Sequence, residues 1–414
     1  MPKLDYSDDG SLLAEIRRKV NATFSRKDLR RYDYAFDAVT WAIGIAHVAT
    51  LALLIANVIP AWAFVIIMVL TRTALAGAGH YQLHRKWKQQ RDRSFALPMG
   101  KALFDINYVG TSLIGTDGHV LLHHPYLGSG ADVKKTFFDS MLRLHPVLRI
   151  PGYTLHKLGI CLTGLSVRAR EISKFERPRD KTRSGTRFLG DASRADFWLI
   201  RALIVAEFGL CLATGHVLAW LVQFFLTLWF NTFLVVASHD FEEETTETEL
   251  AVIPEPLRND WAAQQICLSY DLSVVGNRWI DLFLSAGLSP HRVHHVLPWQ
   301  GSGFANLASE AAVREVCAEV GIAWERPRNL IFGRFPAVIK HYLLRPAQAA
   351  RPQGEVPVPP PPPGQRPMQP PAEGAFPMPP PPPGSLPAPP AGSVMGQIGE
   401  LFRYTSDGFR GVGV

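Results

Sequence analysis

The chain has 414 residues, of which 47% are hydrophobic and 19% are charged, and its formal net charge is +7. The apolar residues are concentrated in long blocks, which indicates membrane spans rather than a larger soluble core. The basic residues flank these blocks, as they do in cytoplasmic membrane loops, so the positive charge does not predict nucleic-acid binding. The four cysteines are widely scattered and include no C-x-x-C pair, which argues against a disulfide framework and against a zinc site.

Residues 1–37 are predicted to form a cytoplasmic N-terminal segment. They contain no basic stretch followed by an apolar one, so no cleaved signal peptide is expected. Residues 38–59 then carry no charged side chain and are long enough to cross a hydrocarbon core of about 30 Å. Pro60 ends this run, and a second apolar stretch from Ala61 towards His80 is long enough to return. Basic residues flank both ends of this predicted hairpin, which places both ends in the cytoplasm.

A second apolar pair, residues 197–214 and 217–237, turns around residues 215–216 and is also preceded by basic residues. The sequence therefore predicts an all-α integral membrane protein with four transmembrane helices arranged as two hairpins. The same charge pattern predicts cytoplasmic termini.

Three charged residues, Arg72, Arg201 and Glu207, lie inside these predicted spans. Charges at that depth usually face protein or water, so we interpret them as internal ion pairs that orient the helices. A direct role in substrate or proton handling is the alternative. Three other apolar stretches are too short or too mixed to span and are expected to lie in the membrane interface as amphipathic segments. They are residues 106–114, 153–165 and 272–288.

Residues 346–393 are rich in proline and contain two PPPPPG runs, a composition that favours extended polyproline and cannot form a core. We expect a disordered linker that acts as a tether or as a docking site for a proline-reading partner. Residues 394–414 form a short last segment whose role the sequence does not indicate. The predicted organisation is therefore an N-terminal segment, a membrane domain over residues 38–345, the proline-rich linker and the C-terminal segment.

Nine of the 14 histidines fall in four short clusters, all on the predicted cytoplasmic side of the spans. The clusters are His80 with His84, His119 with His123 and His124, the single His239, and His291 with His294 and His295. Histidines four residues apart share one face of a helix and can share a metal ion. Three such boxes at corresponding membrane exits indicate a metal site and argue against a purely structural role.

The number of histidines bears on the kind of metal site. Neutral imidazole binds iron, zinc and copper, so the residue type alone does not select the metal. Nine imidazoles are too many for one tetrahedral zinc ion, which takes four ligands. The set is the right size for two metal ions with four or five ligands each.

The three boxes read HYQLH, HVLLHH and HRVHH, in that order. Residues 269–298 also carry an Asn-x-x-x-Asp stretch that leads into Gly-Leu-x-x-His-x-x-His-His-x-x-Pro. In these motifs the chain resembles the membrane fatty-acid desaturase superfamily, which includes related hydroxylases, epoxidases and ketolases. The resemblance covers residues 38–345.

The resemblance implies a di-iron centre with O2 as co-substrate, ligated by the box histidines and by one further histidine after the fourth span. The implied iron ligands are His80, His84, His119, His123, His124, His239, His291, His294 and His295. Two positions depart from common patterns of the family. Val235 stands where some members have asparagine, so the resemblance does not extend to a water-mediated ligand there. His291 begins the third box, where many front-end desaturases have glutamine.

The remaining histidines match no box and are interpreted as packing or surface residues. They are His47, His145, His156, His216 and His341. Several acidic residues are interpreted either as acceptors for imidazole N–H groups or as members of solvated loops. They are Asp117, Asp132, Asp240, Glu242, Glu243, Glu244 and Asp281.

The resemblance implies an O2-dependent oxidoreductase that introduces a double bond into a long acyl chain, carried as an acyl lipid or as acyl-CoA. Hydroxylation or epoxidation of an acyl chain or of a small hydrophobic metabolite is the alternative, because the ligand boxes do not separate these outcomes. A non-catalytic metal-binding membrane protein is a third hypothesis. The proline-rich tail supports it, and the complete ligand set opposes it.

The sequence contains neither the His-Pro-Gly-Gly signature of cytochrome b5 nor a cysteine cluster for an iron–sulfur centre. Electrons are therefore expected from a separate protein of the ferredoxin or cytochrome b5 type. Basic residues within 85–93 and 168–187 would attract such an acidic donor. The expected partners are thus a lipid or acyl-thioester substrate, the membrane and this donor, with the histidine boxes in the cytoplasm.

Overall fold

The computed structural model describes residues 11–85, 103–109, 119, 123–124, 127, 142, 144–163, 194–239, 253–258 and 260–347. Within these ranges the chain is mostly helical, and one small parallel sheet pairs β1 (Leu272–Ser273) with β2 (Arg328–Asn329). The basic stretches after residue 85 and around 168–187, and the tail from residue 348 onwards, lie outside the described residues.

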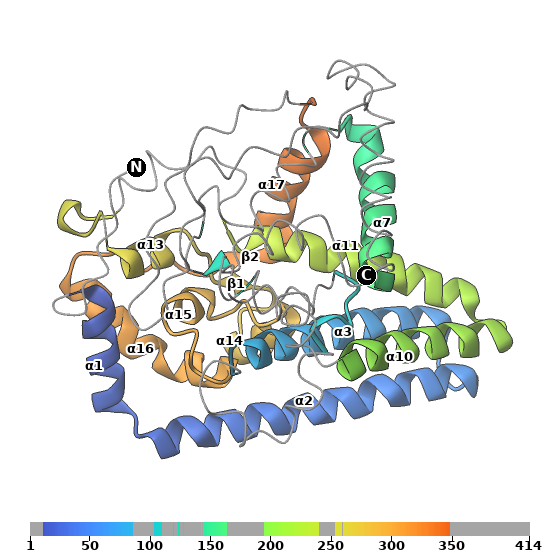
Figure 1. Ribbon diagram of the computed structural model, residues 1–414, viewed down its shortest axis with the longest axis horizontal. Coiled ribbons are helices and arrows are strands. Elements are labelled where there is room, and N and C mark those ends of the chain that lie inside the picture. The colour runs from blue at the N-terminus through green and yellow to red at the C-terminus, as the bar shows by residue number, and fades with distance from the viewer. Residues whose placement is uncertain are drawn as a thin grey trace, which may run out of the picture.

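Four long helices run side by side along one direction of the molecule (Figure 1). They are α2 (Arg26–Ile55), α3 (Ala61–Arg85), α10 (Arg194–Ala213) and α11 (Val217–Ala237). Among the described helices, α2, residues 61–82 of α3 and α11 are long and apolar enough to cross a membrane. The role of α10 as a fourth span therefore stays a prediction.

Local sequence signals set the ends of the first two long helices. Ser25 and Asp28 form a capping box, in which each side chain accepts a hydrogen bond from the other residue's backbone N–H, so α2 begins at Arg26. This start lies before the apolar stretch, and the first turns of α2 are charged. A short turn follows α2, with Asn57 at a φ of 56°, and α3 begins directly after Pro60.

The charged residues within the bundle form ion pairs between segments. Arg72 of α3 pairs with Glu207 of α10, and Arg201 of α10 pairs with Asp105 at 2.6 Å. The other carboxylate oxygen of Glu207 lies 3.1 Å from Nε2 of His47 on α2. These contacts confirm the interpretation as internal ion pairs that tie the helices together.

A cap of shorter helices lies around and beyond one end of the four long helices (Figure 1). It contains α1 (Leu12–Thr23), the short turn η4 (Glu255–Leu257), α13 (Trp261–Cys267), α14 (Arg278–Leu284), α15 (His291–Val296) and α16 (Gly303–Glu319). Apolar residues of α1, α13, α15 and α16 share one buried cluster, which anchors the N-terminal helix to the segments that carry the third histidine box.

The remaining helices run across the direction of the long ones in Figure 1. They are α7 (Pro146–Thr163) and the continuous segment of η5 (Leu330–Arg334), α17 (Phe335–Ile339) and η6 (Lys340–Leu344). The apolar stretch predicted at residues 153–165 falls largely in α7. Of residues 106–114, only 106–109 are described, and they form turns.

Residues 272–288 do not form one amphipathic segment, so that expectation was wrong. They form β1, a turn and the short helix α14. Gly276 adopts a φ of 85°, and the side chain of Asn277 accepts hydrogen bonds from the first backbone N–H groups of α14. A positive φ ends the extended strand, and an asparagine N-cap starts a new helix, so the apolar run is divided in two.

Candidate metal centre

The first histidine pair lies near the C-terminal end of α3, where this helix leaves the bundle and enters the cap. His80 and His84 are one helical turn apart, so their rings share a face, and their centroids lie 5.5 Å apart. Both side chains are buried. The helix that crosses the bundle therefore also presents two imidazoles to the cap.

The third box is fixed against α3 by a close contact of the two backbones. Gly77 packs directly on the backbone of Ala286, and a Cβ at Gly77 would overlap it. Tyr81 donates a hydrogen bond of 2.9 Å from its hydroxyl to the carbonyl oxygen of Gly287. This turn leads into α15, which carries His294. The close backbone approach thus sets how near the third box lies to the first.

Five imidazoles from three segments form the first group of the site. The members are His80, His84, His119, His124 and His294, and all are buried. One ring nitrogen of each lies within 4.8 Å of those of the others. The Nε2 atom of His119 lies 2.6 Å from Nε2 of His80 and 3.1 Å from Nε2 of His124. Convergence of several imidazole nitrogens on a small volume is the arrangement that a coordinated metal ion requires.

A second group lies beside the first. It contains His123, His239 and His295, which are also buried and meet the same distance criterion. The Nε2 atom of His291 lies 3.1 Å from Nε2 of His295, and its ring centroid lies 4.6 Å from that of His239. The ring of His124 stacks on that of His295 at 4.3 Å, so the two groups adjoin.

Hydrogen bonds fix the tautomers of two of these imidazoles. Nδ1 of His295 lies 2.8 Å from Oε1 of Gln265, and Nδ1 of His291 lies 3.2 Å from the carbonyl oxygen of Ser238. A carbonyl oxygen only accepts, so each Nδ1 carries the proton and each Nε2 presents its lone pair. Two lone pairs at 3.1 Å repel each other, and a shared or adjacent cation removes that repulsion. The donor set therefore fits a metal ion.

Burial keeps the imidazoles in the form that binds metals. The pKa of His124 and the pKa of His295 are well below the ordinary value, because desolvation disfavours the charged ring and neighbouring histidines add to this effect. Both rings are therefore neutral at physiological pH. Neutral imidazole is the ligand form.

Gln265 is expected to act on the metal through His295. Gln265→Ala removes the acceptor that orients this imidazole and should weaken iron affinity about ten- to a hundredfold. Gln265→Glu keeps an acceptor oxygen and should retain most of the affinity. The measurement is chelator competition on the purified iron-loaded protein. Gln264→Ala is the matched control on the same helix, because the side chain of Gln264 donates its hydrogen bond to the carbonyl oxygen of Arg258. Equal iron retention in the alanine variants of Gln264 and Gln265 would contradict this role.

Of the five histidines set aside from the boxes, the four whose side chains the structure describes do not join either group. His47 lies in the bundle, His216 precedes α11 at the far turn, and His145 is exposed. His341 is buried in η6, where burial lowers its pKa to about 4. The side chain of His156 is not described.

Only one of the acidic residues proposed near the boxes lies within the described residues. Asp281 is buried and accepts hydrogen bonds from the Ser273 hydroxyl and from the backbone N–H groups of Val275 and Gly276. Asp281 therefore closes the loop before α14. It is neither an acceptor for an imidazole N–H nor part of a solvated loop, so both interpretations from the sequence were wrong. Asp117, Asp132, Asp240 and Glu242 to Glu244 lie outside the described residues.

Several supporting residues were not found from the sequence. Gln265, Tyr81 and Gly77 all act on partners far away along the chain. Arg334 is another: it donates to the carbonyl oxygens of Ala237 and His239 and so holds the end of α11. No local spacing marks such residues, because their role depends on tertiary contacts.

A family model described as fatty acid desaturase matches residues 56–327. The chain belongs to the fatty acid desaturase family. Comparisons with curated proteins and with solved structures gave no match. The histidine clusters of this desaturase-family protein are its histidine boxes, and its apolar helices agree with a membrane oxidoreductase. Enzymes of this family are typically iron-dependent, and the neutral nitrogen donors described above suit iron.

Proposed function

We propose that this chain is an O2-dependent desaturase of long acyl chains in which the eight box histidines and His239 hold two irons. Two adjoining groups of buried imidazoles carry the proposal, because a single ion needs only one group. The first ion would take His80, His84, His119, His124 and His294. The second would take His123, His239 and His295, with His291 beside them.

The protein's own contribution is to hold neutral imidazoles in fixed orientation and away from water. Gln265 and the Ser238 carbonyl keep the protons of His295 and His291 on Nδ1, so that each Nε2 would be free to bind a metal ion. All nine side chains are buried. When bound, the irons would supply the O2 chemistry that removes hydrogen from an unactivated methylene. Electrons would come from a separate ferredoxin or cytochrome b5, received on basic cytoplasmic segments.

The substrate class and the membrane topology rest on the family and on the apolar helices. Two hairpins with four spans would place the cap in the cytoplasm, and the charged first turns of α2 favour this orientation. An acyl chain enters such a site from the bilayer, whether it is carried as acyl lipid or as acyl-CoA. Hydroxylation or epoxidation is the second candidate, because the same ligands serve both outcomes.

Expression in a desaturase-poor host, followed by mass spectrometry of total acyl lipids, tests this function. We expect a product lighter than its precursor by the mass of two hydrogens. The product should be absent in the His294→Ala, His295→Ala double variant, which loses one ligand from each group. A product heavier by one oxygen would move the assignment to a hydroxylase or epoxidase. Unchanged lipids with no bound iron would favour a non-catalytic protein.

A further inference from the structure

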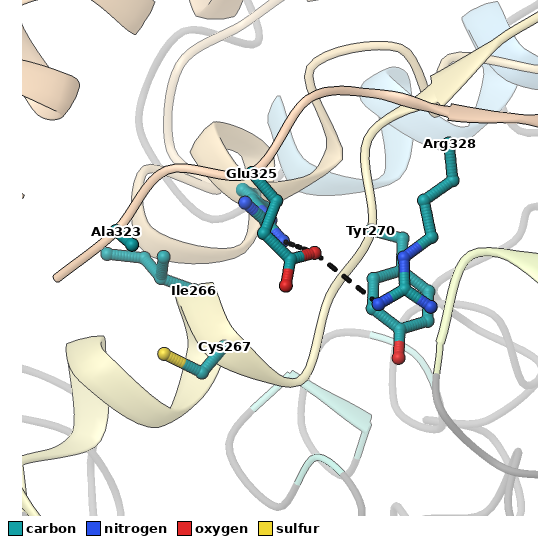
Figure 2. A pocket seen from close by; sticks show the side chains of 7 residues that line it. Ile266, Cys267, Tyr270, Ala323, Glu325 and Arg328 are labelled. Carbon is teal, nitrogen blue, oxygen red and sulfur yellow. Dashed lines mark hydrogen bonds and ion pairs between the residues drawn. The ribbon is translucent and has the colours of Figure 1, made fainter. Parts of the chain in front are cut away.

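A small pocket of about 30 Å³, open to solvent on one side, lies in the cap behind the third histidine box. It is formed by the end of α13, by α15 and by the segment before β2, and its lining residues are Ile266, Cys267, Tyr270, Arg292, Ala323, Glu325 and Arg328. Figure 2 shows the carboxylate of Glu325 pointing towards the guanidinium of Arg328, which lies against the ring of Tyr270. The cavity is thus lined by charged groups and is separate from the histidine groups.

Arg292 is the buried charge of this cavity, with its side chain only 5% exposed. Its Nε donates to the carbonyl oxygen of Ser269 at 2.8 Å, and its Nη2 donates to Glu325 at 3.1 Å. Its Nη1 is buried and has no hydrogen-bond partner within the described part of the chain. A buried guanidinium N–H without an acceptor is costly, and the described residues supply no acceptor for this one.

Arg328 adds a second positive charge. Its guanidinium carbon lies 3.5 Å from the ring centroid of Tyr270, and its Nη2 lies 3.4 Å from Glu325. Glu325 is therefore shared between two arginines, and its side chain is 46% exposed. Two guanidinium groups against one partly exposed carboxylate leave the cavity with a net positive charge.

We propose that this pocket binds a small oxyanion, a phosphate or a carboxylate group. The anion takes the place of the Glu325 carboxylate and accepts hydrogen bonds from Arg292 and Arg328. Guanidinium groups match the planar spacing of such oxygens and bind them bidentately. The pocket is lined by residues of α13 and α15, which belong to the cap and not to the four long helices (Figure 1), and this favours an anion from the aqueous phase over a lipid headgroup.

Isothermal titration of the full chain in nanodiscs of neutral lipid tests this pocket, with phosphate and acetate as probes and ionic strength held constant with sodium chloride. We expect saturable binding of at least one probe. Arg328→Gln should weaken it about tenfold or more, because it removes a charged hydrogen bond. Glu325→Gln should tighten it, because it removes the competing carboxylate. Arg326→Gln is the matched control, since Arg326 is exposed and does not line the cavity.

The relative affinities of phosphate and acetate then identify the chemical class of the ligand. Absence of binding of both probes would overturn the proposal, as would equal losses in the Arg326 and Arg328 variants. Unchanged affinity in Glu325→Gln would rule out that the anion takes the place of the Glu325 carboxylate. If the protein no longer binds phosphate in nanodiscs that contain phosphatidic acid, a lipid headgroup reaches the pocket. This result would contradict an aqueous source for the anion.

Discussion

Replacing His119 by alanine should lower the iron content from two ions per chain to one or fewer and reduce product formation by more than about a hundredfold. The Nε2 atom of His119 contacts those of both His80 and His124, so it is central to the first group. Loss of an outer hydrogen-bond partner of a ligand already costs about ten- to a hundredfold, and loss of a ligand should cost more. Metal analysis of the purified variant, paired with lipid profiling, measures both effects.

His145→Ala is the matched control for this variant. His145 is exposed and lies outside both histidine groups, so its replacement should leave the iron content and the product unchanged. Full iron content in His119→Ala would show that the first group is not a metal site. An equal loss in both variants would indicate general damage to the protein rather than loss of a ligand.

Replacing Gly77 by valine should prevent iron loading, although Gly77 is no ligand. A Cβ at this position would overlap the carbonyl carbon of Ala286 and lie 2.7 Å from its oxygen and 2.8 Å from its Cα. These are backbone atoms, which cannot turn aside as a flexible side chain would. Overpacking typically costs about 1–3 kcal/mol, and here the strain would separate α3 from the turn that leads into α15. Thermal unfolding measures the loss of stability, and metal analysis measures the loss of iron.

Gly44→Val distinguishes this contact from a general cost of valine in a long helix. Apart from α2's own backbone and the two chain neighbours, no atom of the described residues lies within 4 Å of a Cβ built at Gly44, so this variant should load iron normally. Normal iron content in Gly77→Val would show that the backbone contact does not position the third box.

The long apolar blocks were the most predictable part of the fold. Residues 38–59 and 217–237 have no charged side chain; α2 covers the first block as far as Ile55, and α11 covers the whole of the second. Hydrophobicity over that length leaves a helix as the main way to satisfy the backbone in lipid. The position at which α2 begins was harder to predict from the sequence, because its charged first turns depend on the local cap formed by Ser25 and Asp28.

The histidine groups could be predicted as a set but not as two separate groups. Spacing within a box shows which imidazoles share a face, as for His80 and His84. It does not show that His123 and its neighbour His124 fall in different groups, because this depends on how the second box packs between α3 and α15. Asp281 was misread for a similar reason: its partners are backbone N–H groups of a loop that only the folded chain forms.

The most direct test of the central claim is the iron content of the full-length protein, purified after anaerobic loading with ferrous iron, together with Fe K-edge absorption. Two buried groups of imidazoles predict two irons per chain with nitrogen as the main ligand atom. One metal ion per chain, no retained iron, or a ligand shell dominated by oxygen would contradict a di-iron centre built from these nine histidines.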